Sequence, residues 1–200
     1  IIIMSPQGKV LQTINKQSGL SSNGTSALFW DRQHNLWIGS SGVGICKVDM
    51  NLPFTHFFSQ PVRSLGSLPD GSFYVGSVGV AKYNASTGSF EILPSLKGAG
   101  DPIFIRDGNQ LILGSNKGQY VIKGEKTTLI KAGIKTDAML ISKRYPNLLC
   151  AGTYGDGLVI FIRDKAQAGG WRYLGAVPQT KNETIHWITE QQDGSLWITN

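Results

Sequence analysis

Tryptophan, aspartate and glycine gather between residues 19 and 48, densely enough to be considered first as a site of chemistry. Trp30 and Trp37 could stack on sugar rings, because indole is a large flat surface that is apolar on its faces. Asp31 directly follows Trp30, and its carboxylate could take part in binding a metal ion. Gly39 closes the apolar run that contains Trp37. The first question is whether these residues form a site or a scaffold.

The sequence lacks the local motifs of common catalytic and nucleotide-binding sites. It has no G-x-S-x-G nucleophile elbow, no G-x-x-x-x-G-K-[ST] loop, no G-x-G-x-x-G fingerprint and no H-E-x-x-H zinc pattern. A Gly-Asp-Gly corner around Asp156 lacks the D-x-[DN]-x-[DN]-G spacing of a calcium loop. We therefore expect no cofactor, no metal and no catalytic residue. Paired carboxylates contributed by distant loops, as in glycoside hydrolases, stay open as an alternative.

The same residue types recur along the chain at a regular spacing. Short apolar runs ending in a small residue are anchored at Trp37, Tyr74, Ile112, Cys150 and Trp197, at spacings of 37, 38, 38 and 47 residues. A polar turn precedes each of these runs, and Asp-Gly and Asn-Gly turns are strong hairpin signals. A third and a fourth apolar run follow each complete copy. The period therefore predicts four short antiparallel strands per repeat.

Many of these runs are apolar on both sides, as in "ALFW", "LWI" and "LVIFI", which predicts sheets that are covered on both faces. Together with the period, this indicates an all-β fold, a β-propeller of four-stranded blades. Residues 1–200 would form a single propeller domain or a propeller fragment, with about four full blades and half a blade at each end. The halves could close a five-bladed ring, or the chain is an arc of a larger propeller.

Composition and charge exclude several classes of protein. Of the 200 residues, 40% are hydrophobic, 16% are charged and 25 are glycine, which disfavours coiled coils and disorder. The net charge is +6, but the basic residues are spread along the chain, so we expect no nucleic-acid partner. No apolar stretch reaches the 18 residues of a membrane span. Cys46 and Cys150 lie in apolar runs and are expected to be free thiols, although a disulfide stays open.

Repetition favours scaffold roles for the residues considered first. Trp37 and Trp197 occupy the slot that Tyr74, Ile112 and Cys150 fill elsewhere, so both are expected in the core. Trp187 lies on a first strand beside His186 and could reach the mouth of the ring. The aspartates at the hairpin turns are expected to accept hydrogen bonds from turn backbone. They are Asp31, Asp70, Asp107 and Asp193.

The stretch "LSSNGTSALFWDRQHNLWIGSSGVGICKV" resembles the two-component regulator propeller repeat, and "DGSLWIT" resembles the middle of the same motif. The resemblance implies a non-catalytic sensor propeller of a hybrid two-component signalling protein of Bacteroidetes, in the periplasm and responding to oligosaccharides. A histidine kinase would lie elsewhere in such a protein, and the larger propeller of which this chain would be an arc would have seven blades. The partners implied are an oligosaccharide ligand and a second copy, joined through the complete ectodomain.

Propeller ligands usually bind where the loops between blades and the loops between second and third strands converge at one mouth. This topology selects nine candidate ligand-binding residues. They are Asn23, Thr25, Ser41, Asp101, Lys117, Tyr154, Asp156, Asn182 and His186. Tyr154 could stack on a sugar face, while Asn23, Asn182 and Asp156 would bind hydroxyl groups.

Overall fold

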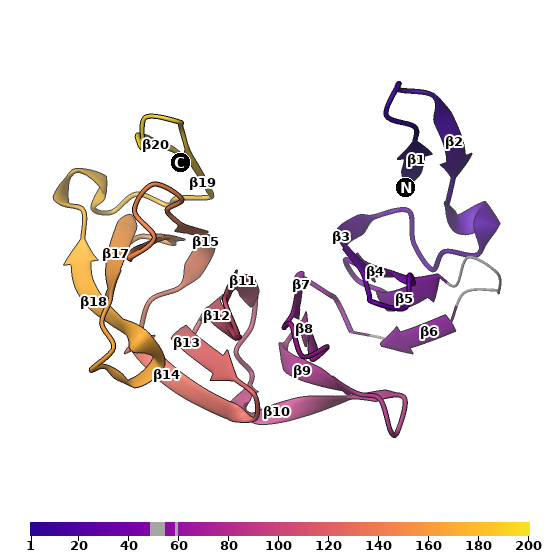
Figure 1. The fold of residues 1–200 in the computed structure, drawn as a ribbon, viewed down its shortest axis with the longest axis horizontal. Coiled ribbons are helices and arrows are strands. Elements are labelled where there is room, and N and C mark those ends of the chain that lie inside the picture. Colours follow the sequence, from indigo (N-terminus) through magenta and orange to yellow (C-terminus); the bar gives the residue numbers. More distant parts are fainter. Residues whose placement is uncertain (49–54, 59) are drawn as a thin grey trace.

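The computed structural model describes residues 1–48, 55–58 and 60–200. Its strands form six antiparallel sheets that follow one another around an open arc, and the first strand of each sheet lies on the inner side of the arc (Figure 1). No α-helix occurs in these described ranges, where the helical segments are three short 3-10 turns, Lys16–Ser18, Ala168–Gly170 and Pro178–Thr180. The predicted all-β, propeller-like fold is thus confirmed.

Four of the sheets have four strands and are here called blades 1 to 4. Blade 1 contains β3 (Thr25–Trp30), β4 (Leu36–Ser40), β5 (Gly44–Val48) and β6 (Thr55–Phe58). Blade 2 contains β7 (Ser64–Ser67), β8 (Phe73–Gly76), β9 (Gly79–Asn84) and β10 (Ser89–Lys97). Blade 3 contains β11 (Ile103–Asp107), β12 (Gln110–Ser115), β13 (Gly118–Lys123) and β14 (Lys126–Ala132). Blade 4 contains β15 (Thr136–Ile141), β16 (Leu148–Thr153), β17 (Leu158–Arg163) and β18 (Trp171–Ala176). The sequence predicts the last strand of blade 1 in the apolar run "FTHFF", residues 54–58, and residue 54 lies outside the described residues.

The remaining strands form two separate hairpins at the ends of the arc. They are β1 (Ile2–Met4) with β2 (Val10–Thr13), and β19 (Trp187–Glu190) with β20 (Leu196–Thr199). Figure 1 shows the two hairpins facing each other across the opening of the arc. They do not combine into one sheet, so the composite blade that would close a five-bladed ring is not formed in this structure.

The apolar core is divided into slabs between neighbouring sheets. Trp37 packs with Val62 and Phe73 between blades 1 and 2, and Ile112 packs with Leu149 between blades 3 and 4. The anchor side chains of blades 1 to 4 are therefore buried, as the repeat predicts. Each slab needs a sheet on both sides, so adjacent blades stabilise each other.

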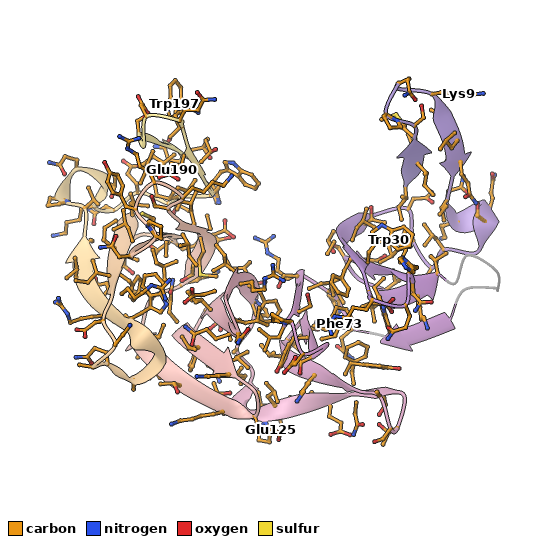
Figure 2. All side chains as sticks on the ribbon, in the orientation of Figure 1. Lys9, Trp30, Phe73, Glu125, Glu190 and Trp197 are labelled. Carbon is orange, nitrogen blue, oxygen red and sulfur yellow. The ribbon has the colours of Figure 1, made fainter. Side chains whose placement is uncertain are left out.

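Trp197 corrects the expectation that it lies in the core. It is 66% exposed and projects from the end of the arc (Figure 2), whereas Trp37 is 3% exposed. The difference follows from the sheets, because β4 is covered by the neighbouring strand β5 and by blade 2, and β20 lies in a two-stranded sheet. Trp187, on β19, is equally exposed.

A glycine near the end of the second strand of each blade touches the start of the next sheet. A Cβ atom added to this glycine would lie 2.6–2.8 Å from an atom of the next sheet, which is closer than van der Waals contact allows. The four contacts are Gly39 to Val62, Gly76 to Pro102, Gly114 to Thr136 and Gly152 to Ile185. The glycine of the repeated motif is therefore required by the close packing of blade against blade.

Three of the four turn aspartates act as predicted. Asp31, Asp70 and Asp193 accept hydrogen bonds from backbone N–H groups two residues further on, at 2.8–2.9 Å. Asp107 is the exception, because its carboxylate binds side chains of the next blade. It accepts two hydrogen bonds from the Arg163 guanidinium, at 2.8 and 3.0 Å, and one from Trp171 Nε1 at 3.1 Å.

These contacts determine the ionisation of Asp107. Its burial acts to raise the pKa, but the hydrogen bonds from Arg163, Gln110 and Trp171 outweigh burial and hold the pKa of Asp107 below its usual value. A carboxyl with a lower pKa in the folded state stabilises the fold above its unfolded-state pKa of about 4. That stabilisation is lost as the pH falls through the folded-state pKa.

We predict that Gly152→Ala lowers the free energy of unfolding by about 1–3 kcal/mol, because the new methyl group would lie against the Ile185 carbonyl oxygen at 2.6 Å. Urea denaturation measures the change. The matched control is Gly24→Ala, where the nearest atom to the added Cβ, Ser22 Oγ, is 3.6 Å away. Equal effects of the two substitutions would contradict the role assigned to Gly152.

We also predict that Asp107→Asn lowers the free energy of unfolding by roughly 1–3 kcal/mol at pH 7, through loss of the charged hydrogen bonds to Arg163. Below about pH 4, the free energy of unfolding of the variant should depend less on pH than that of the parent chain, because the titrating carboxyl group is gone. Denaturation at several pH values tests both expectations. Glu125→Gln, which removes an ion pair whose carboxylate is 93% exposed, should have little effect.

Candidate functional site

The nine candidate residues fall on three parts of the arc. Asn23, Thr25 and Ser41 lie on blade 1, and Asp101 and Lys117 lie on blade 3. The other four surround the corner after β16 and the segment that leads into β19. They are Tyr154, Asp156, Asn182 and His186. Blades 2 and 3 lie between the blade 1 group and these four along the arc (Figure 1), and Tyr154 and His186 are predicted residues whose rings the structure brings into contact.

The three candidate residues of blade 1 lie among contacts with the backbone and in a turn. Asn23 accepts a hydrogen bond from the Lys16 backbone N–H at 2.9 Å through its side-chain oxygen. Thr25 pairs with Ser40 across the β3–β4 ladder, and Ser41 lies in the exposed turn after β4. Asn23 and Thr25 therefore belong to the chain entering β3, whereas Ser41 lies at the corner between β4 and β5.

A repeated hydroxyl shapes the corners that carry Lys117 and Asp156. The Thr153 hydroxyl accepts a hydrogen bond from the Asp156 backbone N–H at 3.1 Å, and the Ser115 hydroxyl accepts one from the Lys117 N–H at 3.2 Å. The two corners are therefore equivalent in blades 3 and 4. Lys117 nevertheless turns toward blade 2, where its Nζ donates to the Lys97 carbonyl at 3.0 Å.

Backbone pairing brings Tyr154 and His186 together. Tyr154 forms an isolated antiparallel bridge with Thr184, and the Gly155 N–H donates to the Glu183 carbonyl at 3.2 Å. The segment leading into β19 is thereby held against the corner after β16. As a result the rings of Tyr154 and His186 meet edge to face, with centroids 5.7 Å apart.

Asp137, on β15, is the centre of the polar contacts in this region. Its Oδ1 lies 2.6 Å from the Arg63 guanidinium and its Oδ2 lies 2.6 Å from His186 Nδ1. The carboxylate is 8% exposed, so both contacts are shielded from water more than a surface ion pair is. Since Arg63 precedes β7 and His186 precedes β19, one carboxylate joins blade 2, blade 4 and the last hairpin.

Tyr154 offers an accessible ring within this polar group. It is 39% exposed, and Lys135 Nζ lies 4.1 Å from its ring centroid, in cation–π contact. Burial raises the pKa of Tyr154, and the negative charges of Asp137 and Asp101 raise it further. The phenol therefore remains a hydrogen-bond donor at neutral pH. We call Arg63, Lys135, Asp137, Tyr154 and His186 the inner cluster.

Arg63, Lys135 and Asp137 are members of this cluster that the sequence prediction missed. A signal was present, because Arg63, Lys135 and His186 each directly precede the first strand of their sheet. Aligning the repeats on the first strand would have placed all three at the same level of the arc. Asp101 and Asn182, which were predicted, lie in the neighbouring loops with positive φ angles of 51° and 70°, a conformation that Asp and Asn tolerate better than other non-glycine residues.

The two cysteines are free and buried, as expected. Burial, with a smaller contribution from Glu190, raises the pKa of Cys150 to about 11, so its thiol is a poor nucleophile at neutral pH. Within residues 1–48, 55–58 and 60–200, no group of three or more His, Cys, Asp or Glu side chains is arranged to hold a metal ion. In the same ranges, no helix has the length and apolar character needed to cross a membrane.

Comparison with known proteins places this geometry in context. Residues 19–42 match the model of the two component regulator propeller. No curated protein matches the chain. The extracellular domains of two putative hybrid two component systems of B. thetaiotaomicron, BT3049 and BT4673, have similar structures, with TM-scores of 0.66 and 0.67 and identities of 17% and 16%. PorZ, a surface component of the type-IX secretion system of Porphyromonas gingivalis, follows with a TM-score of 0.58 at 14% identity.

The matched regions cover nearly all of this chain but a minor part of those proteins. The shares are 99% of this chain and 27% of BT3049, 94% and 27% for BT4673, and 88% and 26% for PorZ. At these identities the likeness concerns the fold. The chain thus contains a two component regulator propeller repeat at residues 19–42 and has the β-propeller fold seen in extracellular domains of hybrid two component systems.

Proposed function

We propose that the chain is a non-catalytic ligand-binding propeller in the periplasmic sensor region of a hybrid two-component signalling protein, and that it binds an oligosaccharide at the inner cluster. The observation that carries the proposal is the half-exposed Tyr154 ring, placed among charged and hydrogen-bonding groups that come from several blades. The propeller repeat and the similar extracellular domains support the sensor role.

The chemistry of the inner cluster suits a sugar. An exposed aromatic face packs against the C–H groups of a pyranose ring, while polar groups around it bind the hydroxyls. Around Tyr154, the exposed side chains of Asp156, Asn182 and His186 can accept or donate hydrogen bonds. Asp101 and Lys117 lie on the adjacent blade 3 and could extend the site along the arc.

The position of the cluster suits a sensor. Asp137 links blade 2, blade 4 and the last hairpin through Arg63 and His186. A ligand that contacts Arg63 or His186 would change the strength of these links, and so the relative placement of the blades. A ligand shifts a conformational equilibrium through such a difference in affinity between two states. Signalling through a kinase domain elsewhere in the protein, and pairing of two complete ectodomains, belong to the same proposal.

One observation favours a second candidate, a propeller lyase or glycosidase. The His186–Asp137 contact is a titratable pair of the kind that enzymes use for acid–base chemistry. Glycoside hydrolysis, however, usually requires two carboxyl groups that flank the scissile bond. Both oxygens of Asp137 are already engaged, by Arg63 and by His186, which leaves this carboxylate poorly placed as a nucleophile or general acid.

We predict that Tyr154→Ala weakens oligosaccharide binding at least tenfold, because it removes the ring on which the sugar would stack. The measurement is isothermal titration calorimetry of the 200-residue chain with a panel of neutral oligosaccharides. The matched control is Tyr145→Ala, which truncates another exposed tyrosine, in the turn between β15 and β16.

Product analysis of the same mixtures separates the two candidates. Binding without turnover, weakened by Tyr154→Ala and unaffected by Tyr145→Ala, is the expected result. Cleavage of an oligosaccharide that is abolished by His186→Gln would establish the enzyme instead. An absence of heat across the whole panel would contradict binding at the inner cluster.

A further inference from the structure

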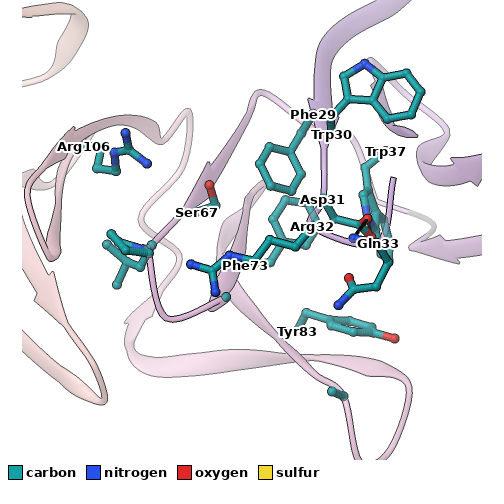
Figure 3. Close-up of a pocket in the computed structure, with 14 residues that line it drawn as sticks. Phe29, Trp30, Asp31, Arg32, Gln33, Trp37, Ser67, Phe73, Tyr83 and Arg106 are labelled. Atoms are coloured by element: carbon teal, nitrogen blue, oxygen red, sulfur yellow. Dashed lines mark hydrogen bonds between the residues drawn. The ribbon is translucent and has the colours of Figure 1, made fainter. Parts of the chain in front are cut away.

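A second concave region lies at the seam between blades 1 and 2, away from the inner cluster. It is a pocket of about 390 Å³, lined by the β3–β4 turn, the β7–β8 turn and part of β11 (Figure 3). The inner cluster lies near the starts of the first strands, whereas this pocket lies near their ends. The two regions therefore open on opposite faces of the blades.

The floor of this pocket is aromatic. Phe29 and Phe73 stack with ring centroids 4.9 Å apart, and the Trp37 ring lies 5.1 Å from Phe73. Tyr83 completes the wall on the blade 2 side, at 5.5 Å from Trp37. These rings belong to the apolar slab between the two blades, so buried side chains of that slab pack against the floor of the pocket.

The rim carries polar and cationic side chains. Arg32 and Gln33 come from the β3–β4 turn, Ser67 ends β7 and Arg106 lies on β11. In Figure 3 the Ser67 hydroxyl lies between the guanidinium groups of Arg32 and Arg106. Within the described part of the chain, neither guanidinium donates a hydrogen bond or forms an ion pair, and both are exposed.

The carboxylates near the pocket are already satisfied by groups of the protein. Asp31 Oδ2 accepts hydrogen bonds from Trp37 Nε1 and Asn35 Nδ2, both at 2.8 Å, and Oδ1 accepts one from the Gln33 N–H at 2.9 Å. Burial would raise the pKa of Asp31, but these bonds hold it below its usual value. Asp70 likewise accepts a hydrogen bond from the Ser72 N–H, which lowers the pKa of Asp70, and the charge of Arg32 lowers this pKa slightly further. The groups of the pocket that remain available to a ligand are therefore the positively charged hydrogen-bond donors, the guanidinium groups of Arg32 and Arg106.

We propose that this pocket binds an acidic saccharide unit, a sugar ring that carries a carboxylate. Guanidinium groups recognise carboxylates through paired, charge-assisted hydrogen bonds, which Arg32 and Arg106 are free to supply. The apolar floor accepts the C–H face of the ring, and Gln33 and Ser67 bind its hydroxyls. An aromatic acid would share the first two contacts but would leave Gln33 and Ser67 without partners.

The test is a titration of the ¹⁵N-labelled 200-residue chain, followed through the tryptophan indole N–H resonances. Trp37 donates its indole N–H to Asp31 at the pocket, and Trp30 lines the same pocket, so both report locally. The probes are cellobiouronic acid, its neutral counterpart cellobiose, and benzoate. We expect saturable shifts of Trp30 and Trp37 with cellobiouronic acid, with at least fivefold weaker binding of cellobiose and of benzoate.

Variants assign the binding to the guanidinium groups. Arg106→Gln and Arg32→Gln should each weaken the binding of cellobiouronic acid at least fivefold. Lys9→Gln is the matched control, because it removes one exposed positive charge at the tip of the β1–β2 hairpin (Figure 2) and should leave the affinity unchanged.

Several results would overturn the proposal. These are an absence of saturable shifts, equal affinity for cellobiose, or equal weakening by Lys9→Gln and Arg106→Gln. Benzoate binding as tightly as the acidic disaccharide would replace the saccharide with an aromatic acid. Shifts that Tyr154→Ala abolishes would place the ligand at the inner cluster instead. None of the pocket residues belongs to the inner cluster. If neutral oligosaccharides do not bind at the inner cluster, the test of acidic saccharide binding at the pocket is therefore unaffected.

Discussion

The contact between a second-strand glycine and the start of the next blade is the constraint on which the rest of this structure depends. At Gly39, Gly76, Gly114 and Gly152 there is no room for a Cβ atom, because the neighbouring blade lies within van der Waals distance. This approach sets the distance between adjacent sheets, and hence the thickness of the apolar slab that Trp37, Tyr74, Ile112 and Cys150 help to fill. A larger residue would separate the blades and open that slab.

Packing blade against blade also determines which polar groups meet. The glycine contacts bring the starts of successive first strands together on the inner side of the arc. Arg63, Lys135 and His186 directly precede such strands, and Asp137 lies just inside one. Charged side chains from separate repeats therefore converge on one buried carboxylate. On the opposite face, the turns at the other ends of the first strands diverge enough to leave the aromatic pocket between blades 1 and 2.

Repeat architecture separates scaffold from function in a way that single motifs do not. Trp37 and Gly39 have counterparts in the other blades and serve packing. Tyr154 and Arg106, in contrast, are not repeated as an aromatic and a cationic residue in each blade. The scaffold therefore does not require them, and they can serve a separate role. Asp107 shows the intermediate case, because it occupies the repeated turn position and accepts a hydrogen bond from Gln110 of its own hairpin, but it also binds Arg163 and Trp171 of the next blade.

The sequence by itself determined the all-β class, the repeat, the strand order and the roles of the turn residues Asp31, Asp70 and Asp193. These features follow from patterns among residues close in the chain: short apolar runs, tight turns and Asp side chains that bind their own turn. The exposure of Trp197 and the joining of Arg63 to Asp137, 74 residues apart, were decided by the tertiary structure. Such features depend on which sheets lie beside each other and at what distance, and a local pattern carries no information about either.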